Sequence, residues 1–281
     1  MTVDLDIAPH PNKVSWEKGD FSRIAATSRK SGEEFVASLG ITTGMQVLDL
    51  GCGDGTTALP AARKGADVLG VDIASNLVAA GNARAEAEQL HNIRFVEGDA
   101  ADLSGIPDGG FDLVISTFGA MFALRPLHVA KEMVRVSRPG GRIVMANWIP
   151  GHPSFVAETI RISLGYLPAP PPGFVNPFTW GIEGQVVERF AAAGIKPASI
   201  HFERAIWRTR FTGSPAEMID VFRNYNGPAM ETYAAAERQG RTQELQREML
   251  DLINTHNRAT DGKIELASTY LKVIVARDQP A

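Results

Sequence analysis

Cysteine, basic charge and long hydrophobic runs are all scarce in this sequence of 281 residues. The single cysteine, Cys52, cannot form an internal disulfide, which is typical of proteins from the reducing cytoplasm. Lysine and arginine together number 28 against 32 aspartates and glutamates, so the net charge is −4. A nucleic-acid-binding protein usually carries a basic excess that neutralises phosphates. We therefore expect a cytoplasmic protein with no nucleic-acid partner.

The longest apolar stretch is too short to cross a membrane. It runs from Phe111 to Leu124, contains Asp112 and has fourteen residues, whereas a spanning helix needs about 20. The first twenty residues carry four acidic groups and no apolar run, so they do not resemble a secretory signal. No membrane partner is expected. The hydrophobic fraction of 44% is that of an ordinary globular protein with a sizeable core.

Short apolar runs alternate with helical patterns through the first half of the chain. The runs are rich in Val, Ile, Leu and Phe and are bounded by Gly, Asp or Pro, which predicts strands. Alternating strands and helices indicate a parallel sheet that is covered on both faces. The predicted strands are Gln46–Leu50, Asp67–Val71, Ile93–Val96, Phe111–Ser116 and Arg142–Ala146, and the helical patterns are Thr56–Lys64, Ser75–Leu90 and Pro126–Arg138.

The second half is less regular. Pro168–Pro177 contains five prolines and is predicted to be a loop, followed by a helix over Gly181–Ala193. Two long strands, Ser199–Phe211 and Lys263–Arg277, would complete the sheet. Between them, Ser214–Asn257 is rich in helix, and an insertion of this length usually covers a site. We therefore predict an α/β, Rossmann-like, doubly wound sheet of seven mostly parallel strands, with an antiparallel edge strand and a helical cap insertion.

A glycine loop follows the first predicted strand. Gly51, Gly53 and Gly55 stand on alternate positions after a buried run and before a helix, which indicates a ligand-binding loop. The dinucleotide fingerprint G-x-G-x-x-G would need a glycine where Thr56 stands. Asp72 closes the next strand, and a carboxylate there can accept the ribose hydroxyls of either a dinucleotide or an S-adenosyl ligand. On these residues alone the choice of cofactor stays open.

The motifs, taken in order from Gly44 to Trp148, resemble the class I S-adenosylmethionine-dependent methyltransferases. The resemblance is to the small-molecule branch that includes ubiquinone-biosynthesis-type enzymes (methyltransferase type 11). The segments that carry it are DLGCGDG (49–55), VDIA (71–74), EGDA (97–100), FDLVIS (111–116) and RVSRPGG (135–141). The resemblance implies S-adenosyl-L-methionine as cofactor, S-adenosyl-L-homocysteine as product, and methyl transfer to an O, S, N or C atom of a small molecule.

The resemblance also implies a role for each matching position. The three glycines would lie against the methionyl and ribose parts of the cofactor, Asp72 would hold the ribose hydroxyls, and Asp99 and Ala100 would bind the adenine. The full set of implied cofactor residues is Asp49, Gly51, Cys52, Gly53, Gly55, Asp72, Ile73, Asp99, Ala100, Ser116 and Phe118. Residues 1–40 would form an N-terminal helical lid segment, 41–150 the cofactor-binding core, and 151–281 the rest of the sheet with the cap at about 214–257.

The residues at the end of the fourth predicted strand narrow the range of possible methyl acceptors. Ser116-Thr117-Phe118-Gly119 lacks the Asn/Asp-Pro-Pro-aromatic motif common in enzymes that methylate nucleic-acid or protein nitrogens. Ser116 is also a poor ligand for a hard cation, so no metal is expected. What remains is a small molecule with a hydroxyl, thiol, amine or acidic carbon. Its pocket is predicted to be lined by Trp16, Phe21, Met121, Phe122 and Tyr225.

A general base would help a neutral alcohol to react. His128 and His152 follow the fourth and fifth predicted strands, and Tyr225 lies in the cap, so these three are the predicted catalytic residues. The other candidates are His10, Tyr166, Tyr233 and His256. Two alternatives stay open: a nicotinamide-dependent oxidoreductase, or a non-catalytic protein that binds S-adenosylmethionine. Either a monomer or a homodimer is compatible with the sequence.

Overall fold

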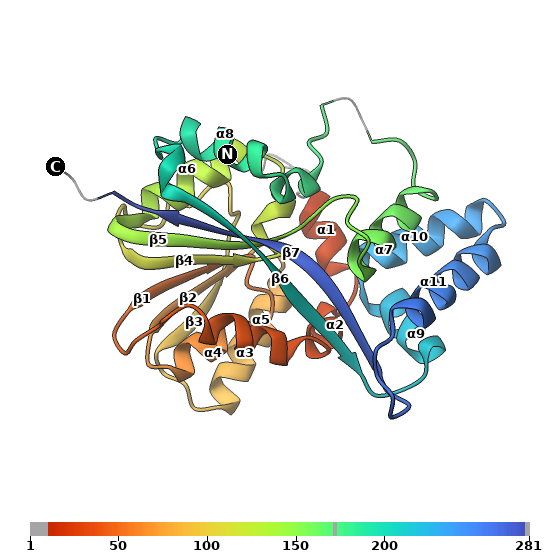
Figure 1. Ribbon diagram of the computed structural model, residues 1–281. Helices are drawn as coiled ribbons and strands as arrows, with labels where there is room; N and C mark the ends of the chain where they lie inside the picture. Colours follow the sequence, from red (N-terminus) through yellow and green to blue (C-terminus); the bar gives the residue numbers. More distant parts are fainter. Residues whose placement is uncertain (1–10, 171–172, 279–281) are drawn as a thin grey trace, which may run out of the picture.

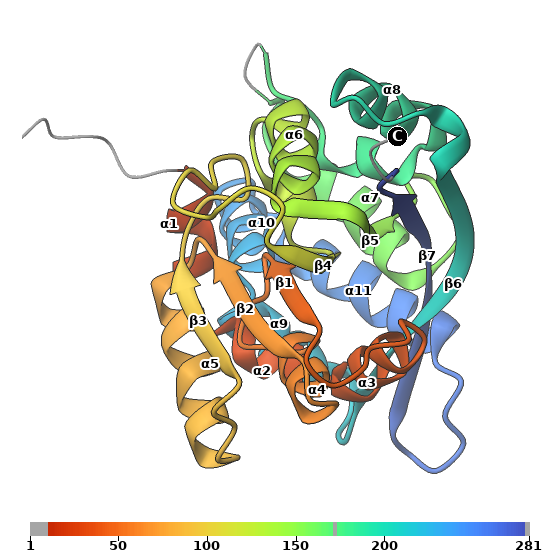
Figure 2. The ribbon, with the colours of Figure 1, turned by 90° about the vertical axis from the view of Figure 1, so that its left-hand side faces the viewer.

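The computed structural model describes residues 11–170 and 173–278. Its centre is a seven-stranded sheet in the order β3-β2-β1-β4-β5-β7-β6 (Figures 1 and 2). The first five strands run parallel, and β7 runs antiparallel to β5 and β6. The strands are β1 Gln46–Leu50, β2 Asp67–Asp72, β3 Ile93–Glu97, β4 Phe111–Thr117, β5 Ser137–Trp148, β6 Ile200–Phe211 and β7 Ile264–Ala276. The predicted fold class is confirmed, with the antiparallel strand one position in from the edge that β6 forms.

Helices cover both faces of this sheet and extend beyond one end of it (Figures 1 and 2). The α-helices are α1 Pro11–Glu17, α2 Phe21–Ala26, α3 Arg29–Ala37, α4 Ala58–Arg63, α5 Ser75–Ala87, α6 Pro126–Val136, α7 Phe155–Leu164, α8 Glu183–Ala192, α9 Pro215–Tyr225, α10 Gly227–Arg238 and α11 Thr242–His256. The short 3-10 helices are η1 Ala120–Phe122, η2 Pro177–Gly181 and η3 Pro197–Ser199.

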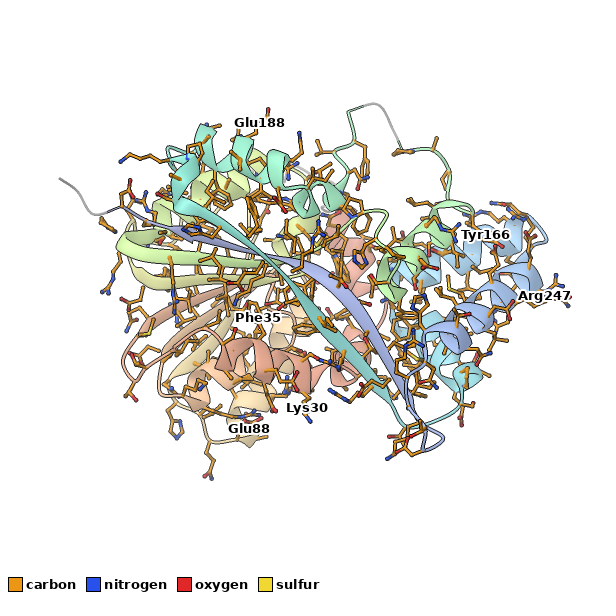
Figure 3. All side chains as sticks on the ribbon, in the orientation of Figure 1. Lys30, Phe35, Glu88, Tyr166, Glu188 and Arg247 are labelled. Atoms are coloured by element: carbon orange, nitrogen blue, oxygen red, sulfur yellow. The ribbon has the colours of Figure 1, made fainter. Side chains whose placement is uncertain are left out.

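Two hydrophobic clusters lie on opposite faces of the sheet because successive strand residues point to opposite sides. In β1, Leu48 faces the cluster beneath α6 and α8, while Val47 faces the one beneath α3 and α4. In Figure 3, Phe35 of α3 lies inside the second cluster, whereas Lys30, Glu88 and Glu188 are on the surface. Both faces are therefore buried, which is why the central strands are almost continuously apolar.

A third hydrophobic cluster lies in the cap. Helices α7, α9, α10 and α11 enclose it, and β7 contributes Ile264 and Leu266. Figure 1 shows these helices gathered at one end of the sheet, with α1 and α2 between them and the core. Tyr166, labelled in Figure 3, is buried here, while Arg247 is exposed on α11. The predicted cap insertion is thus present, and α7 joins it from a different part of the chain.

Candidate functional site

The glycine loop connects β1 to α4 at the carboxyl edge of the sheet. Gly51, Gly53 and Gly55 all have positive φ angles, of +66°, +55° and +89°, a region that side chains with a Cβ rarely adopt. The loop is attached to the end of β2 because the Gly51 and Cys52 amides donate to the Val71 carbonyl, at 2.8 and 3.2 Å. Its conformation therefore depends on glycine and on a contact with the neighbouring strand.

Only the middle glycine of the three faces open space. A Cβ at Gly53 would meet no atom within 4 Å. By contrast, a Cβ at Gly51 would lie 2.5 Å from Gly119, and one at Gly55 would lie 2.7 Å from the ring of Phe95. Gly51 and Gly55 are thus required by the fold, while Gly53 leaves a bare backbone that a ligand can approach.

Asp72 connects the glycine loop to the turn that follows β2. Its Oδ2 accepts the Gly53 amide at 2.8 Å, and its Oδ1 accepts the Ala74 amide at 2.9 Å. The residue is buried, and this desolvation raises the pKa of the carboxyl, although the amide hydrogen bonds act in the opposite direction. Each carboxylate oxygen has a second lone pair, so Asp72 can also accept a ligand hydroxyl.

Asp49 carries an oxygen that nothing in the described chain satisfies. The Thr57 hydroxyl donates to Oδ2 at 2.6 Å, but Oδ1 is buried without a hydrogen-bond partner among the described residues. Complete burial raises the pKa of this carboxyl to about 7, and the charge of Asp72 acts in the same direction. An unpartnered buried carboxylate oxygen is costly. A cationic or hydrogen-bonding ligand would satisfy Oδ1.

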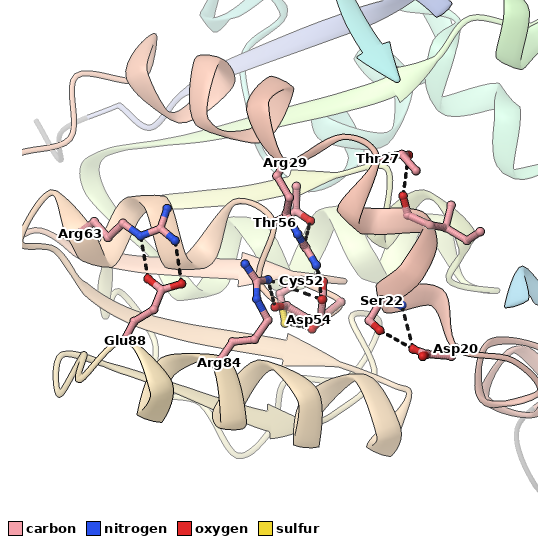
Figure 4. Close-up of polar contacts among 12 residues, drawn as sticks. Asp20, Ser22, Thr27, Arg29, Cys52, Asp54, Thr56, Arg63, Arg84 and Glu88 are labelled. Atoms are coloured by element: carbon pink, nitrogen blue, oxygen red, sulfur yellow. Dashed lines mark hydrogen bonds and ion pairs between the residues drawn. The ribbon is translucent and has the colours of Figure 1, made fainter. Parts of the chain in front are cut away.

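Asp54 fixes the loop through two arginines that are distant in the sequence (Figure 4). Arg29, the first residue of α3, donates from both terminal nitrogens to the Asp54 carboxylate and also to the Thr56 hydroxyl. Arg84 of α5 donates to the Asp54 carbonyl at 2.5 Å. Asp54 is only 2% exposed. Sequence pattern alone does not predict these residues, because their contact joins three separate elements.

Asp99 and Ala100 lie beyond β3. The Asp99 carboxylate accepts the Ala101 amide at 2.8 Å, and its other oxygen lies 3.4 Å from Arg125. Asp99 remains partly exposed, as do Ala100 and Ile73 after β2. The structure thus brings the predicted adenine and ribose residues to the same carboxyl edge.

Ser116 is fully engaged by the backbone. Its hydroxyl donates to the Leu50 carbonyl at 2.7 Å and accepts the Ala120 amide at 2.9 Å, and the residue is 2% exposed. Ser116 therefore holds the ends of β1 and β4 together rather than presenting a free hydroxyl.

Phe118 belongs to an aromatic cluster over the end of the sheet. It has a φ of +57°, unusual for a non-glycine residue. Its ring stacks on Trp148 with centroids 3.6 Å apart, and the edges of Trp207 and Tyr270 approach at 5.0 and 5.6 Å. Burial raises the pKa of Tyr270 to about 12.

Three of the five predicted pocket residues lie in contact. Trp16 makes edge contacts with Phe21 and Phe122, each at 5.3 Å between centroids, and Phe178 extends this wall at 6.1 Å from Phe122. Phe178, which lies just beyond the proline-rich loop, was not among the predicted pocket residues. Met121 is buried beside this wall in the sheet cluster.

The three predicted catalytic residues lie in different parts of the structure. His128 is exposed and lines a surface depression of about 370 Å³ together with Arg125, Lys131 and Arg135. The ring of Tyr225 lies under Arg23, whose guanidinium carbon is 4.5 Å from the ring centroid. His152 follows β5, and its buried Nδ1 has no hydrogen-bond partner in the described chain.

The remaining candidate bases are engaged within the cap. The Tyr166 hydroxyl donates to Glu248 at 2.6 Å, and Tyr233 donates to Gln246 at 3.1 Å. His256 lies 3.4 Å from Glu158. His10 lies outside the described residues. Within residues 11–170 and 173–278, no group of three or more His, Cys, Asp or Glu could hold a metal ion, and no helix is long and apolar enough to cross a membrane.

A parallel sheet with a glycine loop after β1 and a carboxylate ending β2 defines a class of α/β proteins that bind nucleotide-like cofactors at this edge. Comparison with known proteins narrows the class. Residues 48–145 match the family model of the methyltransferase domain. The chain is also 35% identical over 225 residues to Uncharacterized protein Rv1403c of Mycobacterium tuberculosis, a match that covers 79% of each chain.

Two further likenesses agree with this result. The demethylmenaquinone methyltransferase of Renibacterium salmoninarum is 35% identical over 120 residues, which are 43% of this chain and 47% of that enzyme. The solved YcgJ protein of Bacillus subtilis shares the fold, with a TM-score of 0.56 and 18% identity over 89% of this chain and 99% of that one. The chain belongs to the S-adenosylmethionine-dependent methyltransferases of the small-molecule type. This confirms the family and the cofactor that the motifs predict.

The residues present fit S-adenosylmethionine. The open backbone at Gly53 leaves room for a ligand, and Asp72 has free lone pairs for hydroxyls. The unpartnered Oδ1 of Asp49 suits a cationic group, and this cofactor carries both an ammonium and a sulfonium.

Proposed function

We propose that this methyltransferase acts on a small acceptor with an apolar or aromatic body and one nucleophilic O, S, N or C atom. The observation that carries this proposal is the aromatic wall of Trp16, Phe21, Phe122 and Phe178. Apolar pockets with few polar groups are typical of such ligands. The wall is formed by α1, α2, η1 and η2, and η1 begins three residues after β4. An acceptor held there is therefore close to the carboxyl edge of the sheet.

The chain contributes orientation and exclusion of water. When bound, S-adenosylmethionine supplies an electrophilic methyl group. We propose that Asp49, Asp72, Asp99 and the glycine loop hold the cofactor, and that the aromatic wall orients the nucleophile. Positioning of this kind can supply most of the rate acceleration. His152 is the proposed general base for a neutral acceptor, because its Nδ1 has no hydrogen-bond partner among the described residues.

The remaining assignments are proposals of the same kind. We assign residues 1–40 to the lid segment, 41–150 to the cofactor-binding core and 151–281 to the acceptor side, with α7 added to the cap. The single cysteine and the net charge of −4 support a cytoplasmic enzyme that works without a nucleic-acid partner.

Two measurements test the proposal. Calorimetry should detect binding of S-adenosylhomocysteine to the wild type. Asp72→Ala should weaken the binding free energy by roughly 1.5–3 kcal/mol, the scale of a hydrogen bond to a charged group. Turnover should then be measured with a panel of phenols, thiols and amines. Phe122→Ala should raise the KM of the best acceptor, and Phe174→Ala, an exposed aromatic, is its control. A chain that binds the cofactor product but turns over no acceptor would favour the non-catalytic alternative.

A further inference from the structure

The N-terminal segment 12–27, which contains most of α1 and all of α2, lies between the cofactor edge and the cap. On the core side, Lys13 forms an ion pair with Glu97 at the end of β3. Glu17 accepts hydrogen bonds from the Ser75 amide at 2.9 Å and from its hydroxyl at 2.6 Å. Ser75 begins α5, three residues after Asp72. Both contacts thus attach the segment to residues that adjoin the ribose and adenine positions.

On the cap side, the segment meets the junction of α9 and α10 through two glycines. A Cβ at Gly227 would overlap the Ser15 carbonyl, and a Cβ at Gly19 would overlap the Tyr225 carbonyl. The guanidinium carbon of Arg23 lies 4.5 Å from the centroid of the Tyr225 ring, so a further residue of the segment contacts this junction. Each glycine therefore permits a backbone contact that no other residue type would allow.

These contacts lie at Asn226-Gly227-Pro228, where α9 ends and α10 begins. From the sequence, a glycine before a proline suggests a flexible bend. In the structure, Gly227 is buried, and the Asn226 side chain caps α10 by accepting the Ala229 amide at 3.2 Å. The junction is a fixed docking point for residues 12–27.

We propose that residues 12–27 couple cofactor binding to the position of the acceptor cap. A cofactor that reaches Asp72 and Asp99 must pass the segment attached to Glu97 and Ser75. Because Ser15 and Gly19 of the segment pack against the α9–α10 junction, the segment moves away from this edge only together with the junction. The cofactor site and the cap therefore open together and close together, and the acceptor binds to a cap that the cofactor has already set. The proposed coupling depends on the assignment of the cofactor site and is independent of the acceptor's identity.

Hydrogen exchange of the full chain, with and without S-adenosylhomocysteine, tests the coupling. In the wild type, the ligand should slow exchange about tenfold both in residues 12–27 and in the cap segment 215–238. In Gly227→Ala, the added Cβ displaces Ser15, so protection should persist in 12–27 and be lost in 215–238. The matched control is Gly184→Ala, near the start of α8, where a Cβ meets nothing within 4 Å. The control should behave as the wild type.

Two results would overturn the coupling. One is a wild type in which the ligand protects 12–27 and leaves 215–238 unchanged. The other is a folded Gly227→Ala protein that keeps the protection of both segments. If circular dichroism shows that Gly227→Ala is unfolded, Arg23→Gln takes its place. Arg23 is exposed, so this variant should fold and lose at least half of the cap protection; full protection would overturn the coupling. Calorimetry separates these results from a failure to bind the ligand, which would contradict the cofactor assignment itself.

Discussion

Gly51 and Gly119 meet backbone to backbone where β1 and β4 end. A Cβ on Gly51 would lie 2.5 Å from the Gly119 Cα, and one on Gly119 would lie 2.6 Å from the Gly51 Cα. Ser116 secures the same approach from within β4 by bonding to the Leu50 carbonyl. The glycine loop therefore depends on a residue 68 positions further along the chain that no cofactor motif includes, as the two residue numbers show.

Gly119→Ala should separate the two strand ends. The added methyl has no space between the backbones, so we expect a loss of about 1–3 kcal/mol in the free energy of unfolding. Affinity for S-adenosylhomocysteine should fall with it, because Gly51 begins the loop. Denaturant unfolding and calorimetry measure the two effects. Gly105→Ala is the control, since a Cβ there meets nothing within 4 Å. Equal stability of the two variants would contradict the steric argument.

Gly53→Val should abolish cofactor binding and leave the fold largely intact. Its side chain would occupy open space where the ligand is expected, at a cost of roughly 1–2 kcal/mol for the positive φ. Gly44→Val is the matched control, because Gly44 also has a positive φ, of +82°, and no atom within 4 Å of its Cβ. The control should lose comparable stability and keep its affinity. Wild-type affinity in a folded Gly53→Val protein would make the loop purely structural.

Asp49 should make stability and cofactor affinity depend on pH in opposite directions. Its pKa is about 7 in the folded chain, against an ordinary value of 3.8. Between these values the unfolded chain has lost a proton that the folded chain retains, so the free energy of unfolding falls as pH rises from about 4 to about 7. Asp49→Asn removes this pH-dependent decrease in the free energy of unfolding. The melting temperature of the variant should therefore exceed that of the wild type by more at pH 8 than at pH 4.

Ionised Asp49 should also attract the ammonium group that S-adenosylmethionine and S-adenosylhomocysteine share. Wild-type affinity for S-adenosylhomocysteine should rise about tenfold from pH 6 to pH 8 as the carboxyl with a pKa near 7 loses its proton. Asp49→Asn should show a flatter profile, and this comparison removes the titration of the ligand's own amino group. Parallel pH profiles of affinity in the two proteins would contradict a role for Asp49 in binding the ligand.

Arg29→Met should loosen the glycine loop from outside the cofactor site. It leaves the buried Asp54 with Arg84 as its remaining cationic partner, and hydrogen bonds to charged groups contribute about 1.5–3 kcal/mol each. We expect a lower melting temperature and a severalfold weaker affinity for S-adenosylhomocysteine. Arg29→Lys should recover part of both. Lys30→Met, at the exposed neighbouring position, is the control; a loss of the same size there would make the Arg29–Asp54 contact unimportant.

The boundaries of the elements show where local pattern suffices. The strand predicted at Gln46–Leu50 is confirmed with the same bounds, because a short apolar run between turn residues specifies it. The strand predicted from Arg142 instead begins at Ser137, since Ser137 pairs with Phe111 before the register shifts. The helix Phe155–Leu164 was not predicted at all, although its apolar residues belong to the cap cluster. In these two cases the signal lies in the partner element rather than in the segment.

The sequence by itself determined the parallel sheet, the glycine loop and the family, because strand periodicity, positive-φ glycines and strand-end carboxylates are properties of short segments. Only the tertiary structure decided that Asp54 is held by Arg29 and Arg84, that Trp16 meets Phe122, and that Ser15 docks on Gly227. Each of these contacts joins residues from separate elements. Their geometry follows from how whole helices are positioned against the sheet, which no single segment encodes.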